Sequence, residues 1–261
     1  MIRSYRRGLS YPGGNSLFSR EFSFALCILT LALTVGVQRI GATDNEKDKQ
    51  QPKPPSVVAD PKTVGGESNS IIQVANLVYA GTKSSECFSD HFLTRAERES
   101  SISTSRRFHT VKLASDEVFH FPLVIMTGEG EFTLLEEERQ NLRVYIERGG
   151  FLLASAGCSS EDWNRSFRRE MQKTFPENSM KQISMDHMVF HTVNDIPKLE
   201  AKHGEPQPIE GIHFGDRLGV LYSQDGLNDT ANSVGCCCCG GNEIVNAEAI
   251  NVNILVYTLL K

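Results

Sequence analysis

Residues 149–163, with the sequence GGFLLASAGCSSEDW, place an apolar run between glycines and follow it directly with a helix-start signal. The run from Phe151 to Ala156 lacks alternation of apolar and polar residues, which is typical of a strand covered on both faces in a parallel sheet. Ser159 or Ser160 can then cap a helix. The buried face of this helix is predicted by large side chains at four-residue spacing: Trp163, Phe167, Met171 and Phe175. The stretch therefore predicts a strand, a tight turn and a helix.

Strands and helices alternate on both sides of this stretch. We expect strands, from apolar content and alternation, at residues 71–80, 108–113, 123–126 and 183–185, and a hairpin from 209–214 and 218–222. We expect helices at residues 87–98 and 243–260, and one opened by a capping box of Thr133 with Glu136 and ended by Gly149. This order predicts an α/β fold with a mostly parallel, flavodoxin-like sheet and helices on both faces.

The N-terminal third has a different composition. Residues 22–37 are largely apolar but shorter than the roughly 20 residues that a spanning helix prefers, so residues 1–42 are typical of a signal peptide. Ala42 fits a cleavage site, whereas Ile40 is larger than usual there, which leaves an uncleaved membrane anchor as the alternative. Residues 43–70 are polar and proline-rich and indicate a disordered linker. We therefore expect a folded domain at residues 71–261 that is periplasmic or secreted, with membrane contact only through residues 22–37 if they are retained.

Charge excludes one class of partner. The chain carries a net charge of -5 and has no basic stripe, so we expect no nucleic-acid partner. No motif in the sequence requires a cofactor. The expected partner is an unknown ligand or a cell-envelope protein.

Several segments resemble an uncharacterised bacterial family of extracytoplasmic domains, a domain-of-unknown-function family whose fold is similar to the class I glutamine amidotransferases. The resemblance is carried by LVIMTGEGEF at 123–132, LRVYIERGGFLLAS at 142–155, SFRREMQKTFP at 166–176, Asp186-His187 with Phe190, and INVNILVY at 250–257. It covers nearly all of residues 71–261. It implies an amidotransferase-like fold but no substrate.

Cys158 is the candidate nucleophile, because it lies between the carboxyl end of the predicted strand and the start of a helix, where a thiolate is favoured. True amidotransferases have their nucleophile in a Gly-x-Cys-x-Gly elbow and a later His-x-Glu pair. Here Ala156 and Ser160 flank Cys158, and neither His187 nor His191 is followed by Glu two residues on. The structural alternative for Cys158 is a half-buried junction residue or one half of a disulfide.

His187 is the first candidate base for Cys158, and His191 is the second. Their four-residue spacing also occurs in zinc sites, but the glutamate of His-Glu-x-x-His is missing. We therefore expect Asp186-His187 to form a local turn, with Phe190 anchored in the core, and we predict no metal at this pair.

Ligand-binding candidates follow the strands at 123–126 and 151–156: Gly128, Glu129 and Gly130 in one turn, and Ser159 in the other. Solvated carboxylates are the structural alternative for Glu129.

Four consecutive cysteines, Cys236–Cys239, are the remaining feature. Their spacing contains Cys-x-x-Cys, which is compatible with zinc or redox chemistry. With Cys87 and Cys158 they form an even set in a compartment that permits disulfides, so we expect disulfide pairing or a thiol-rich loop. The sequence as a whole predicts a binding or interaction module of the cell envelope without amidotransferase activity. The alternative is a cysteine-dependent hydrolase that uses Cys158 with His187 or His191.

Overall fold

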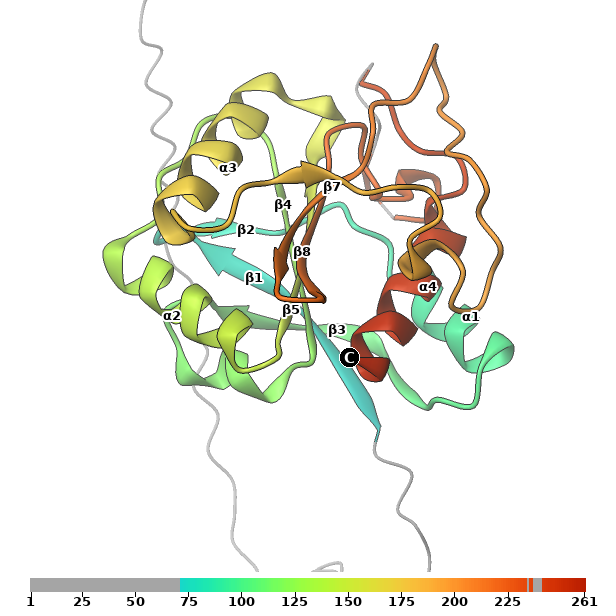
Figure 1. Ribbon diagram of the computed structural model, residues 1–261, viewed down its shortest axis with the longest axis horizontal. Coiled ribbons are helices and arrows are strands. Elements are labelled where there is room, and N and C mark those ends of the chain that lie inside the picture. The colour runs from blue at the N-terminus through green and yellow to red at the C-terminus, as the bar shows by residue number, and fades with distance from the viewer. Residues whose placement is uncertain (1–70, 234, 237–240) are drawn as a thin grey trace, which may run out of the picture. The chain divides into compact units, whose positions relative to one another are not determined.

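The computed structural model describes residues 71–233, 235–236 and 241–261 (Figure 1). The predicted signal peptide or anchor at 1–42, the predicted linker at 43–70 and Cys237–Cys239 lie outside these residues.

The described domain contains eight strands and four α-helices. The strands are β1 (Ile72–Tyr79), β2 (Lys83–Ser84), β3 (Thr104–Lys112), β4 (Leu123–Gly128), β5 (Phe151–Ala156), β6 (Lys181–Gln182), β7 (Glu210–Phe214) and β8 (Arg217–Ser223). The helices are α1 (His91–Glu99), α2 (Glu136–Glu147), α3 (Glu161–Thr174) and α4 (Ala247–Leu260).

The sheet is mixed, so the prediction of a mostly parallel, flavodoxin-like fold is wrong. Its order is β2-β1-β4-β5-β8-β7-β6, and β3 pairs with β1 outside this path. β1, β3, β4, β5 and β8 pair in parallel, whereas β2, β7 and β6 are added antiparallel. The predicted hairpin of β7 and β8 is confirmed, and its tight turn at Gly215-Asp216 forces an antiparallel pair. The two-residue strands β2 and β6 have no apolar pattern from which their direction could be predicted.

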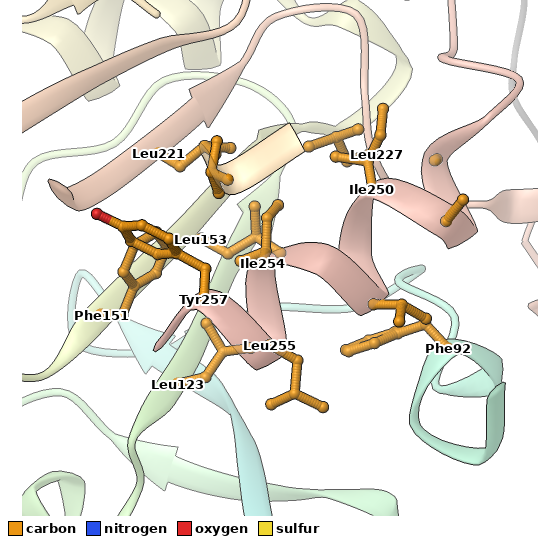
Figure 2. Close-up of a cluster of buried hydrophobic side chains, with 14 of the residues drawn as sticks. Phe92, Leu123, Phe151, Leu153, Leu221, Leu227, Ile250, Ile254, Leu255 and Tyr257 are labelled. Carbon is orange, nitrogen blue, oxygen red and sulfur yellow. The ribbon is translucent and has the colours of Figure 1, made fainter. Parts of the chain in front are cut away.

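Helices cover both faces of this sheet, and the hydrophobic core is divided between the two faces. α1 and α4 lie over one face, and α2 and α3 over the other (Figure 1). Figure 2 shows α4 against the sheet, with Ile250, Ile254 and Tyr257 packed toward side chains such as Leu153 and Leu221. α4 is apolar on nearly all sides because α1 and neighbouring loops cover the face that the sheet leaves open.

The central strand, turn and helix agree with the prediction. β5 is buried at every residue, and Ser160 caps α3 by accepting the Trp163 N–H at 3.4 Å. The Thr133 capping box is wrong, because α2 begins at Glu136 and the N–H of Leu135 donates to Glu138 at 2.8 Å.

Other boundaries also differ from those expected. α1 begins at His91 rather than at residue 87, and α4 begins at Ala247 rather than at residue 243. The strand expected at 183–185 lies earlier, as β6. Within the described ranges, no helix is both long and apolar enough to cross a membrane.

Candidate functional site

Two loops meet at the carboxyl ends of β4 and β5. The N–H of Gly130 donates to Ser160 Oγ at 3.1 Å. A Cβ atom on Gly157 would lie 3.0 Å from the carbonyl oxygen of Gly128 and 3.2 Å from Cγ of Glu129, so a side chain there would push the two loops apart by a few tenths of an ångström. The predicted ligand-binding residues Gly128, Glu129 and Gly130 therefore lie beside the turn that contains Cys158 and Ser159.

The turn itself has an unusual backbone. Cys158 has φ 48° and ψ 31°, and Ser159 has φ 51°, so two successive non-glycine residues are left-handed. Each such residue costs on the order of 1–3 kcal/mol and persists only where its surroundings hold it. Strain of this kind is enriched at ligand-binding and active sites, which makes this turn the centre of the candidate site.

A third segment holds the turn in place. The backbone of Gly241 packs on Cys158 so closely that a Cβ there would lie 2.2 Å from the Cys158 carbonyl oxygen. The Ser159 hydroxyl donates to the carbonyl oxygen of Asn242 at 2.9 Å. We call residues 128–130, 158–160 and 241–242 the carboxyl-edge rim. Within it Cys158 and Ser159 are half-buried and Glu129 is exposed.

Beneath the rim, buried polar side chains fill the end of the sheet. Thr127, Ser155 and Ser223 stand in register across β4, β5 and β8. The Asn228 amide donates to Thr127 Oγ1 and to the carbonyl oxygen of Cys87, both at 2.9 Å, and Ser155 Oγ donates to the Asn228 carbonyl oxygen. Thr127, Ser155 and Asn228 are thus linked by hydrogen bonds, whereas the buried Ser223 Oγ has no hydrogen-bond partner among the described residues.

Glu138 closes the neighbouring end of β1. Its buried carboxylate accepts the N–H groups of Ala80 and Gly81 at 2.9 and 3.0 Å, in addition to that of Leu135. Backbone N–H groups after a parallel strand are where anionic ligands bind in many α/β proteins. Here a side chain of the protein occupies them.

The structure does not bring His187 to Cys158. The His187 ring lies 5.6 Å from the Tyr257 ring, which lies 5.9 Å from the ring of Phe151, the first residue of β5. Cys158 lies two residues beyond Ala156, the last residue of β5, and Ala156 is itself about 17 Å from Phe151 at roughly 3.3 Å per residue. Burial lowers the pKa of His187, and His213 and Lys261 lower it further.

His191 has other partners. One ring nitrogen is 2.7 Å from the carbonyl oxygen of Met185 and the other is 2.6 Å from Asp195 Oδ1. Both partners are acceptors, so the ring donates from both nitrogens, and these contacts raise the pKa of His191. The local turn predicted at Asp186-His187 and the burial of Phe190 are both observed.

Cys87 forms a disulfide with Cys236, with 5.4 Å between the Cα atoms. In the part of the chain that the structure describes, no group of three His, Cys, Asp or Glu side chains could hold a metal ion.

Residues 73–259 match the model of a family described as Domain of unknown function (DUF4159). The chain belongs to this family. A search of curated proteins finds no match. The match confirms the predicted resemblance to a domain-of-unknown-function family, whereas the likeness to class I glutamine amidotransferases is not confirmed by it.

Sequence reasoning missed Asn228 and Glu138 in this DUF4159 domain. Asn228 lies in an irregular segment after β8, where no periodicity marks a buried residue. Glu138 lies in the acidic first turn of α2, where the same residue type is usually solvated. The available signal for Glu138 is a Glu three residues after a helix cap, since the cap is Leu135. The same spacing also joins Thr133 to Glu136, and the sequence therefore predicts the capping box there.

Proposed function

We propose that this DUF4159 domain is an extracytoplasmic, disulfide-stabilised module that binds a ligand or a protein of the cell envelope at the carboxyl-edge rim. The observation that carries the proposal is the buried hydrogen-bond network of Thr127, Ser155 and Asn228 beneath a strained, partly exposed turn. A strained, partly exposed turn that is supported by buried hydrogen bonds offers a rigid surface for recognition.

The position of the histidines supports binding rather than catalysis. A cysteine hydrolase needs an imidazole within hydrogen-bond reach of the thiolate. His187 is associated with Tyr257 and His213, and His191 with Met185 and Asp195.

An extracytoplasmic location is part of the proposal. The disulfide between Cys87 and Cys236 supports it, because such bonds persist in oxidising compartments. The apolar residues 22–37 support export by a signal peptide, with the mature chain starting near residue 43. Cell fractionation tests this part, and recovery of the full-length chain in the cytoplasm would contradict it.

Enzyme kinetics distinguish the proposed binding module from the alternative, a cysteine hydrolase. We expect purified wild-type protein, Cys158→Ser and His187→Gln to hydrolyse p-nitrophenyl esters and glutamine at the same background rate. Turnover that is lost in Cys158→Ser would overturn the proposal. A further loss in His187→Gln or His191→Gln would identify the base.

Binding at the rim is tested with immobilised cell-envelope fractions. We expect Glu129→Arg to weaken retention of the domain at least fivefold, because it reverses the charge of an exposed rim residue without touching the network. The matched control is Glu137→Arg, an exposed position in the first turn of α2. Equal retention of both variants would contradict a role for the rim.

A further inference from the structure

β3 is an edge strand of unusual length for an unprotected position. It spans nine residues and, in the part of the chain that the structure describes, pairs with β1 alone. Its register joins Val74 to Phe108, Asn76 to Thr110 and Val78 to Lys112.

The direction of its free backbone groups follows from this pairing. The Leu113 N–H donates to the Val78 carbonyl oxygen at 2.9 Å, so the residues at 109, 111 and 113 bond to β1. In a parallel ladder alternate residues bond to the same neighbour, so the N–H groups of Phe108, Thr110 and Lys112 are directed to the open side. The side chains of His109, Thr110 and Lys112 are exposed.

At the start of β3, local hydrogen bonds already occupy backbone N–H groups. Arg106 is left-handed at φ 57°, and its N–H donates to Thr104 Oγ1 at 3.1 Å. The Thr104 N–H in turn donates to Glu97 Oε1 at 2.7 Å. The regular, open part of the edge is therefore residues 107–112, which is long enough for a short added strand.

The charge of this edge selects its partner. Its open part, residues 107–112, has the sequence RFHTVK, with two cationic residues, one histidine and no acidic residue, in a chain of net charge -5. Arg106, just before it, pairs with Glu97 at 2.6 Å. Arg107 has an 83% exposed side chain and forms a 3.2 Å pair with Asp90 at the surface. Exposed pairs of this kind are weak and can be exchanged for an incoming carboxylate.

Basic side chains and a histidine flank the edge. Side chains alternate along a strand, so His109, whose ring lies 5.5 Å from that of Phe121, and Lys112 lie on opposite faces, while Arg107 extends to Asp90 beside the start of α1. An added strand would meet these residues through its own side chains on both faces, where opposite charges stabilise a cross-strand pair and like charges oppose it.

From this geometry we propose that residues 107–112 of β3 bind an extended acidic segment of a partner protein, which adds to the sheet as a strand. A second copy of this chain is disfavoured as occupant, because pairing β3 with β3 sets basic residues against basic residues. The proposal does not depend on the role of the carboxyl-edge rim.

Selection from a displayed library of random octapeptides tests this. On wild-type protein we expect enrichment of peptides with Asp or Glu at several positions. Thr110→Pro should weaken the selected peptides at least tenfold, because proline removes an outward N–H and leaves the ladder with β1 intact. Thr110→Val keeps the N–H and should bind as the wild type does.

A second variant covers the case in which Thr110→Pro does not fold. In Arg107→Glu with Lys112→Glu, the preference should change from acidic to basic peptides, whereas Lys181→Glu on β6 should leave it unchanged. Absence of acidic enrichment on the wild type would overturn the proposal. So would acidic peptides that bind both the proline and the charge-reversed variants undiminished, or dimerisation of the wild type through β3.

Discussion

At the scale of single residues, one amide side chain connects the strand ends to the disulfide loop. Asn228 bonds to Thr127, Ser155 and the carbonyl oxygen of Cys87, and it is 3% exposed. Replacing it leaves buried hydroxyl and carbonyl groups without partners. We expect Asn228→Ala to lower the free energy of unfolding by about 2–4 kcal/mol, measured by urea denaturation. The exposed Asn232→Ala should change it by less than about 0.5 kcal/mol, and similar losses in both variants would contradict the role of Asn228.

His187 and His191 predict opposite pH dependences. Burial lowers the pKa of His187, so its contribution to stability is present above the unfolded value of about 6.5 and is lost as the pH falls. The Met185 carbonyl oxygen and Asp195 raise the pKa of His191, so its contribution is present below about 6.5 and is lost as the pH rises through the folded pKa. NMR titration should find that His191 titrates at higher pH than His187. Asp195→Asn should lower only the pKa of His191, and a shift of both histidines would argue against this assignment.

At the residue scale the sequence predicts the position of Cys158 but not its surroundings. The junction of β5 and α3 is encoded locally, by an apolar run followed by Ser160. The contacts of His187 depend on Tyr257 and His213, which are distant in the chain. Spacing along the sequence carries no information on which end of the sheet such a residue reaches.

At the scale of elements, α2 and α3 are joined through one buried carboxylate. The Glu170 side chain is 0% exposed and contacts Arg139 at 2.9 Å, Arg169 at 3.1 Å and Lys173 at 2.9 Å. Burial alone would raise the pKa of Glu170, but hydrogen bonds from Lys173 and Arg169 outweigh it and lower the pKa.

We expect Glu170→Gln to destabilise the domain by about 2 kcal/mol at pH 7, because the cations lose a buried partner. A carboxylate with a lowered pKa contributes stability above its unfolded pKa, and this is lost as the pH falls through the folded value. The difference from wild type should therefore shrink below about pH 4.5, the ordinary glutamate value. Denaturation at pH 7 and pH 3 measures this, with Glu137→Gln as the exposed control. A difference that is the same at both pH values would contradict it.

Elements buried on both faces were predictable and elements at the edges were not. β4, β5 and α3 follow from apolar runs and a serine cap. The start of α2 differs from the prediction because the N–H of Leu135, which a cap at Thr133 would accept, donates to Glu138 at 2.8 Å instead. β3 begins four residues before the predicted strand, since an exposed edge does not need apolar residues.

At the scale of the whole domain, the disulfide closes a loop with a sequence separation of 149. Restricting the unfolded chain over such a length corresponds to about 3–5 kcal/mol. We expect the double variant Cys87→Ser, Cys236→Ser to have a lower free energy of unfolding than the oxidised wild type, by this amount. Wild-type protein in reductant should show the same loss. An unchanged denaturation midpoint in both samples would show that the bond does not form.

The direction of the short strands β2 and β6 was the part of the architecture that sequence could not supply. Apolar runs in β4 and β5 indicate burial on both faces, which fits a parallel sheet, and these strands are parallel. β2 and β6 have two residues each, so their antiparallel pairing depends on how short connections close in space.

The position of β1 has a mechanical consequence. The chain enters the domain at Ile72, and β1 is flanked by β3 on one side and β4 on the other, both parallel to it. A pulling force transmitted along the preceding chain would act along β1, so that the hydrogen bonds to both neighbours are loaded together in shear. Under a load directed along β1, extension of the domain would require both ladders to break at once.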